Sequence, residues 1–332
     1  MVNKIKQFIK ENIVFLVIVI GCYLIMNYEL PYVVYTPGGT INLSERIKGE
    51  STYNVEGSFS MTYVSIARGK IPFVLMSLII PDWDAVSKSE FTYDDNSVKD
   101  TFEIDKIYMN EAISNAKEIA YKAANVEYTI KNVENIITYV NKKAKTKLKY
   151  GDVLIDIDGI IVEDLKVLQD YIATKKVDDI VYIRYKRDGV EHIDDVTLIS
   201  LAGQVKAGIS MAKVKEITSP YKIDVEMKSS ESGPSGGLMT TLAIYNLVTE
   251  EDITKGKKIM GTGTIEEDGS VGEIGGVKYK LIGAVKSGAD IFICPKGNYK
   301  EAVRVAKKKK YDISIISVST FTEALDKLKA LN

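Results

Sequence analysis

A serine in a glycine-rich turn is the first residue of this chain that could do chemistry. Ser235 stands in Ser232-Gly-Pro-Ser-Gly-Gly237, just ahead of a helical apolar pattern that begins at Leu238. Glycine and proline favour a tight turn there, so we expect the hydroxyl at a helix N-terminus. N–H groups at that end have no intrahelical partner and can stabilise an oxyanion. Taken alone, the segment fits an ordinary glycine-rich helix cap equally well.

A second glycine-rich stretch supplies a base for that serine. After Met260-Gly-Thr-Gly-Thr-Ile265, the segment Gly275-Gly-Val-Lys-Tyr-Lys-Leu-Ile-Gly-Ala284 opens a helix with Lys278 in its first turn. The positive potential at a helix N-terminus disfavours a protonated lysine, and a lysine of lowered pKa can act as a general base. We therefore predict Lys278 as the base. Lys280 and Lys286 are expected on other, solvated faces of the helix.

The two segments together resemble the catalytic boxes of the Lon (S16) peptidase domain. Lys278 follows Ser235 by 43 residues, a separation that suits this family, and the resemblance covers about 205–332. It implies Ser235 as nucleophile and Lys278 as base. It also implies an orienting residue for the lysine and a shaped turn around the serine, provided by Thr262, Gly233, Pro234 and Gly236.

One position departs from the family pattern. Many Lon enzymes carry an acidic residue immediately before Gly-Pro-Ser, whereas here Ser232 stands in that place and Glu231 lies one residue further back. This departure leaves the gating of substrate open but does not affect the predicted pair.

Other catalytic schemes fit the residues less well. A Ser-His-Asp triad would need His192, which we expect at the surface of another unit. Ser219-Pro-Tyr-Lys222 matches the Ser-x-x-Lys of penicillin-binding enzymes, but their Ser-Asp-Asn and Lys-Thr-Gly are missing. A signal-peptidase-like Ser/Lys enzyme would not be expected to have the Gly-Gly-x-Lys helix box. No Gly-x-x-x-x-Gly-Lys-Ser/Thr loop occurs, so we expect neither a P-loop nor ATP as a partner.

The elements around the two boxes alternate between strand and helix, which predicts an α/β domain over 203–332. The expected strands are Lys222–Met227, Lys257–Ile265, Ile291–Pro295 and Ile313–Val318. The expected helices are Gly236–Val248, Lys278–Ser287, Tyr299–Lys309 and a last one after Thr320.

Residues 126–202 resemble a PDZ domain of the bacterial type. The order is a strand at Ile136–Val140, a strand from Gly151 to Gly159, a helix at Glu163–Ile172 and a hairpin that turns at Asp188-Gly189. The resemblance implies capture of peptides by strand addition. The carboxylate-binding loop of such domains is expected at Lys131–Asn135, which holds no glycine, so recognition of a free C-terminus is left open.

Residues 31–125 precede this unit and are expected to pack with the peptidase domain. Tyr32–Gly39 and Ser58–Ile66 read as strands, and apolar residues recur at helical spacing over Met109–Asn125. The apolar run Ile71–Ile80 is too short to span a membrane and fits core or a surface flap.

Residues 1–30 carry the targeting signal. Lys4, Lys6 and Lys10 precede the apolar run Ile13–Met26, which flanking apolar residues extend to a feasible span. A cleaved signal peptide fits the same pattern, but no small-x-small cleavage site follows Met26, so we favour an uncleaved anchor. The lysines before the span predict a cytoplasmic N-terminus and a catalytic domain outside the cell membrane.

Composition excludes several partners. The formal net charge of −1 gives no reason to expect nucleic acid, and one histidine with two cysteines cannot form a conventional zinc site. Cys22 lies in the apolar run and Cys294 lies near the far end of the chain, so we expect no disulfide between them. No cofactor is expected.

The sequence therefore predicts an α+β protein with an N-terminal transmembrane helix, a PDZ-like domain and a C-terminal Lon-type domain. The expected function is an ATP-independent, membrane-bound serine endopeptidase that processes secreted or membrane-tethered peptides. The alternative is a non-catalytic PDZ scaffold with a degenerate peptidase domain.

Overall fold

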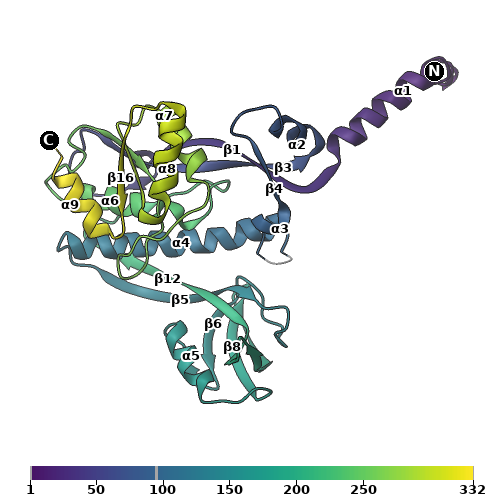
Figure 1. Ribbon diagram of the computed structural model, residues 1–332. Coiled ribbons are helices and arrows are strands. Elements are labelled where there is room, and N and C mark those ends of the chain that lie inside the picture. The colour runs from purple at the N-terminus through teal and green to yellow at the C-terminus, as the bar shows by residue number, and fades with distance from the viewer. Residues whose placement is uncertain (1, 94–95, 332) are drawn as a thin grey trace.

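The computed structural model describes residues 2–93 and 96–331. An N-terminal helix, α1 (Val2–Asn27), projects away from two packed bodies, which Figure 1 shows one above the other. The upper body contains both glycine-rich boxes of the sequence, and the lower body is the smaller one. We call them the peptidase body and the PDZ body, after the units that the sequence analysis expects there.

A six-stranded mixed sheet forms the centre of the peptidase body, in the order β16-β15-β14-β3-β1-β4. The strands are β1 (Glu29–Asn42), β3 (Ser58–Lys70), β4 (Asp84–Ser87), β14 (Lys258–Gly261), β15 (Ile291–Pro295) and β16 (Ser314–Val318). β3, β14, β15 and β16 run parallel, and β1 is antiparallel to both β3 and β4. Residues before 88 thus complete the sheet that carries the second box.

The longer helices of this body are α4 (Val98–Ala123), α6 (Gly237–Leu247), α7 (Val277–Lys286), α8 (Lys296–Lys309) and α9 (Phe321–Lys329), and a shorter helix is α2 (Ile71–Ser77). α6 is apolar on nearly every side and lies inside the main core, against α4, α9 and β3. α7 and α8 pack on one another and enclose a second core under Phe292. Smaller elements are η1 (Leu43–Glu45), β2 (Ile47–Lys48), α3 (Lys88–Phe91), β13 (Asp224–Val225) and η2 (Pro234–Gly236).

The PDZ body is a sheet in the order β12-β5-β6-β8-β9 with one helix, α5 (Leu165–Ala173). Its strands are β5 (Thr129–Val140), β6 (Val153–Ile157), β7 (Ile160–Ile161), β8 (Ile180–Arg187), β9 (Val190–Thr197) and β12 (Ile209–Thr218), with the separate pair β10 (Ile199–Leu201) and β11 (Gln204–Lys206). The body has its own core, centred on Ile137, Leu168 and Val181.

Two neighbouring strands join the bodies. The chain enters the PDZ body along β5 and leaves it along β12, and these strands pair antiparallel over their whole length. We call β5 and β12 together the ribbon, and α4 lies above it (Figure 1). Glu111 of α4 accepts a hydrogen bond from the Lys213 N–H at 2.7 Å, and Glu118 pairs with Lys215 at 2.7 Å.

Several local expectations need correction. Lys131–Asn135 lies inside strand β5 and is not a loop. The expected strand Lys222–Met227 shrinks to β13, which pairs only with β2. The helix expected at Met109–Asn125 begins earlier, at Val98, because Ser97 and Asp100 form a capping box that the apolar periodicity does not reveal.

Candidate functional site

Ser235 lies in the single 3-10 turn η2, directly ahead of α6. Gly233 begins the turn with φ 98°, a conformation that a side chain disfavours, and its N–H donates to the carbonyl of Asp105 on α4 at 3.0 Å. A Cβ on Gly236 would lie 2.5 Å from the sulfur of Met61, so a side chain there would require Met61 to move. The turn is therefore shaped by two glycines and Pro234, and it leaves the N–H of Ser235 without an intrahelical partner.

The backbone of Ser235 is fixed by the strand that the second box supplies. Its carbonyl accepts hydrogen bonds from the Gly263 N–H at 2.8 Å and from the Thr262 hydroxyl at 3.0 Å. Thr262 is itself fully buried at the end of β14. The serine is thus held from the sheet side, while its hydroxyl is left for another partner.

That partner is Lys280. Its Nζ lies 2.9 Å from the Ser235 Oγ and 3.1 Å from the Thr262 Oγ1. The Lys280 side chain reaches this position through the interior, and the residue is only 4% exposed. Burial lowers the pKa of Lys280 from 10.5 to about 7, because an ammonium is costly to remove from water.

The expected contact between Lys278 and Ser235 is not formed. The Lys278 Nζ points away from the serine and pairs with the carboxylate of Asp84 on β4 at 2.6 Å. The expectation that Lys280 is solvated is wrong as well. Lys280 thus has the contact with Ser235 that was expected of Lys278. The lysine that contacts Ser235 follows it by 45 residues and not by 43.

Helix geometry explains the exchange. α7 begins at Val277, after Gly276 in the left-handed conformation, and buries Val277, Leu281 and Ala284. Residue 280 lies three after the first of these and four before the last, so it shares their face, whereas residue 278 is turned about 100° from residue 277. The apolar face of α7 was therefore the signal that could have identified Lys280.

Asp84 joins β4 to the first turn of α7. Besides Lys278, it accepts a hydrogen bond from the hydroxyl of Tyr279 at 2.5 Å. Burial by itself would raise the pKa of Asp84, but the hydrogen bonds from Lys278 and Tyr279 hold it below its usual value. Burial and the same carboxylate raise the pKa of Tyr279. These contacts connect β4 with the start of α7.

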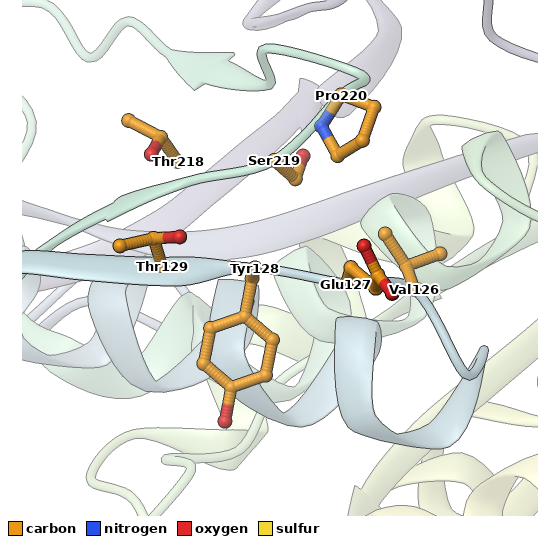
Figure 2. Close-up of a pocket in the computed structure, with 7 residues that line it drawn as sticks. All are labelled: Val126, Glu127, Tyr128, Thr129, Thr218, Ser219 and Pro220. Carbon is orange, nitrogen blue, oxygen red and sulfur yellow. The ribbon is translucent and has the colours of Figure 1, made fainter.

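A cavity of about 640 Å³ lies away from Ser235, where β5 begins and β12 ends. Figure 2 shows the segment around Ser219 and Pro220 facing the residues that lead into β5, with the Tyr128 ring turned away beneath them. It is lined by Val126, Glu127, Tyr128, Thr129, Thr218, Ser219 and Pro220. None of these is a residue of either box, so the cavity does not define the site.

The remaining chemistry-bearing residues stay apart from Ser235. His192 is exposed on β9, where its ring stacks on Tyr185. Cys22 and Cys294 are both unpaired. Among residues 2–93 and 96–331, no three His, Cys, Asp or Glu side chains are grouped so as to hold a metal ion.

Comparison with protein families finds two matches in the chain. Residues 205–330 match the Lon protease (S16) C-terminal proteolytic domain, and residues 119–198 match the PDZ domain. In the part of the chain that the structure describes, one helix, over Lys4–Asn27, is long and apolar enough to cross a membrane.

Similar proteins include several that are named Lon protease. One from Mycoplasma mobile is 25% identical over 92% of this chain and 38% of its own length. One from Neorickettsia sennetsu is 37% identical over 30% of this chain and 12% of its own length. The chain thus spans well under half the length of these relatives. Among solved structures, the PDZ domain of an SdrC-like protein from Listeria innocua is 28% identical, with 24% of this chain and 92% of that chain covered and a TM-score of 0.22.

Proposed function

We propose that this chain, which carries a Lon-type proteolytic domain and a PDZ domain, is a membrane-anchored serine endopeptidase that uses a Ser235–Lys280 dyad. The observation that carries the proposal is the buried Lys280 amine, 2.9 Å from the Ser235 hydroxyl and with its pKa lowered by burial to about 7. A neutral amine in hydrogen-bond contact with a hydroxyl is what activation of a serine nucleophile requires.

In the first half of the reaction, neutral Lys280 takes the proton of Ser235 as Oγ attacks the peptide carbonyl. Thr262 holds the amine in place, since its hydroxyl oxygen lies 3.1 Å from Nζ. The carbonyl oxygen becomes an oxyanion, and the N–H of Ser235, at the start of the turn, would serve as a donor to it. The Lys280 ammonium then protonates the leaving amine, which gives an acyl-enzyme and restores the neutral base.

In the second half, water replaces the leaving group. Lys280 takes a proton from the water as it attacks the acyl-enzyme carbonyl, and returns that proton to the Ser235 oxygen when the ester breaks. Proton transfer of this kind contributes about 10²–10⁴ in rate. Because the lysine needs no third ionised residue, the site differs from a Ser-His-Asp triad.

The other parts of the chain suggest where the reaction occurs. We place the N-terminus in the cytoplasm and both bodies outside, on the basis of Lys4, Lys6 and Lys10 ahead of the span. Substrates would be secreted or membrane-tethered peptides, presented as an added strand by the PDZ body. ATP is not expected to be needed, since the sequence holds no P-loop.

The test is hydrolysis of a flexible fluorogenic peptide by the purified full chain in mild detergent, without ATP. Ser235→Ala and Lys280→Met should each reduce kcat by about 10²–10⁴ or more, and the double variant should be little worse, because the pair acts as one unit. Lys278→Met is the matched control and should stay within about threefold of wild type, since a partly exposed ion pair contributes little.

Two results would contradict the proposal. If Lys278→Met abolishes turnover while Lys280→Met does not, the base is assigned to the wrong lysine. If the wild-type chain cleaves nothing while it still binds peptides, the chain is a PDZ scaffold and not a peptidase.

A further inference from the structure

An apolar segment next to the end of α1 has no part in the chemistry described above. Residues 71–80 contain no charged side chain, and they form α2 and the turn after it. No side chain of α2 is buried, and Leu78 and Ile79 in the turn are 79% and 81% exposed. The other large exposed side chains of the segment are Phe73, Leu75 and Met76. We call residues 71–80 the apolar tip. Contiguous exposed apolar surface of this kind marks an interaction site.

The position of the apolar tip is fixed by the end of the anchor helix. The Ile71 N–H donates to the carbonyl of Tyr28 at 3.3 Å, and the Lys70 amine donates to the side-chain oxygen of Asn27 at 2.9 Å. Figure 1 shows α2 beside the point where α1 ends and β1 begins. If α1 crosses a bilayer, the apolar tip therefore lies at the level where the helix leaves it.

Aromatic side chains mark the same level. Tyr23, Tyr28 and Tyr32 are exposed around the end of α1, and Trp83 follows the apolar tip. Tyrosine and tryptophan are enriched where a membrane meets water, because one end of each ring is apolar and the other is polar. The end of α1 and the tip thus share the composition of an interfacial layer.

The apolar tip is also attached firmly to the peptidase body. Asp82, two residues beyond it, pairs with Lys309 of α8 at 2.5 Å, and Asp84 binds Lys278 and Tyr279 of α7. Between these anchors and α1, the tip has little freedom to fold back over its own apolar side chains.

We propose that the apolar tip inserts into the lipid surface beside α1, as a second contact between the peptidase body and the membrane. This inference rests on the proposed membrane anchoring of α1. Lipid is the occupant because the apolar tip is hydrogen-bonded to the end of α1. Any other partner would have to displace the lipid that surrounds the helix at that level. An apolar face that lies in the interface is stabilised by burial among acyl chains. Two contacts fix the tilt of the body, whereas one helix would leave it free to swing.

The test uses tryptophan quenching in the full chain, reconstituted in lipid nanodiscs. In a Trp83→Phe background, a single tryptophan is introduced by Leu78→Trp, by Val17→Trp within the span, or by Ile193→Trp on the exposed face of β9. Lipids brominated in their acyl chains quench only tryptophans in contact with them. Positions 17 and 78 should each lose about half or more of their fluorescence, and position 193 almost none.

The outcomes separate this inference from the proposal beneath it. Quenching at position 17 without quenching at position 78 overturns the inserted tip and leaves the anchor standing. Absence of quenching at both positions overturns the anchor and the tip together. A blue-shifted but unquenched tryptophan at position 78 would show that a second copy of the chain covers the tip, and it also overturns insertion in lipid.

Discussion

Lys280 and Lys278 are two residues apart on one helix, and their surroundings give them opposite properties. Lys280 is enclosed by the core and contacts only hydroxyl oxygens, so nothing compensates a positive charge on it. Lys278 lies nearer the surface and pairs with the carboxylate of Asp84 at 2.6 Å. A glycine-rich box followed by a lysine was therefore enough to locate the helix but not to choose the lysine, because that choice depends on which face the core covers.

The lowered pKa of Lys280 predicts the pH dependence of catalysis. The base must be neutral, and with a pKa of about 7 the neutral fraction rises by about tenfold between pH 6 and pH 8. We expect kcat/KM of the full chain to rise along a single-deprotonation limb and to level off above about pH 8. Lys278→Met should leave the midpoint unchanged. A midpoint near 10 would mean that burial does not tune this lysine.

The same burial should cost stability. Unfolded Lys280 titrates near 10.5 and folded Lys280 near 7, so between these pH values the unfolded chain binds more protons and stability rises with pH. Lys280→Met removes the penalty and should raise the free energy of unfolding at pH 7.5 by up to about 4 kcal/mol. Urea melts followed by Trp83 fluorescence would measure this. The gain should shrink as the pH approaches 10.5, and a gain independent of pH would exclude this cause.

At the scale of elements, local patterns located most strands and helices of the peptidase body. The expected helices at Gly236–Val248 and Lys278–Ser287 differ from α6 and α7 by one residue at each end. The partners of the strands could not be predicted in the same way. β3 pairs parallel with β14, some 200 residues further along the chain, and nothing in either strand's own pattern specifies that neighbour.

β12 shows a second limit of local patterns. Ile209–Thr218 mixes small and apolar residues with Lys213 and Lys215, and it pairs with β5 and contacts α4. The exposed α2 is a third case, since a short apolar run fits core, flap and interface equally until its neighbours are known.

The link between β4 and α7 gives a prediction at this scale. Asp84→Asn keeps the shape of the side chain but removes the charge that Lys278 and Tyr279 bind, so the free energy of unfolding should fall by about 1 kcal/mol at pH 7. Because the pKa of Asp84 is held below its usual 3.8, its contribution is present above that value and is lost as the pH falls below it.

The difference in stability between the wild type and Asp84→Asn should therefore shrink as the pH is lowered below 3.8, as measured by urea melts across a pH series. Asp312→Asn changes the same charge at an exposed position and serves as the control. A difference that persists unchanged at pH 3 would show that the effect comes from packing and not from the carboxylate.

At the scale of the whole molecule, most of the PDZ body is inserted between two residues that are hydrogen-bonded to each other, Asn141 of the entry side and Gly208 of the exit side. The Asn141 N–H donates to the carbonyl of Gly208 at 2.7 Å, so a short turn can replace residues 142–207 without separating β5 from β12. The excised chain should cleave a short peptide within about threefold of wild type, because the dyad and its cores lie in the other body. Cleavage of a protein substrate should fall by about tenfold or more, since strand addition to the PDZ sheet is lost.

Parallel assays with both substrates, together with the melting temperature of the excised chain, would decide this. Replacement of residues 142–207 by a flexible linker of equal length is the control for chain length. Loss of both activities in a folded chain would show that the PDZ body takes part in forming the active site.

The paired entry and exit strands also bear on how such a molecule could diversify. A module whose two ends lie side by side on paired strands can be exchanged for any other module with adjacent termini. The register in which β5 and β12 pair is then kept. Recombination at Asn141 and Gly208 would then change which polypeptides are delivered while the hydrolytic machinery is inherited unaltered. The pair β5 and β12 is therefore a position at which one recognition module can be exchanged for another in the folded protein. Chimaeras that carry a foreign recognition module could be built at this position.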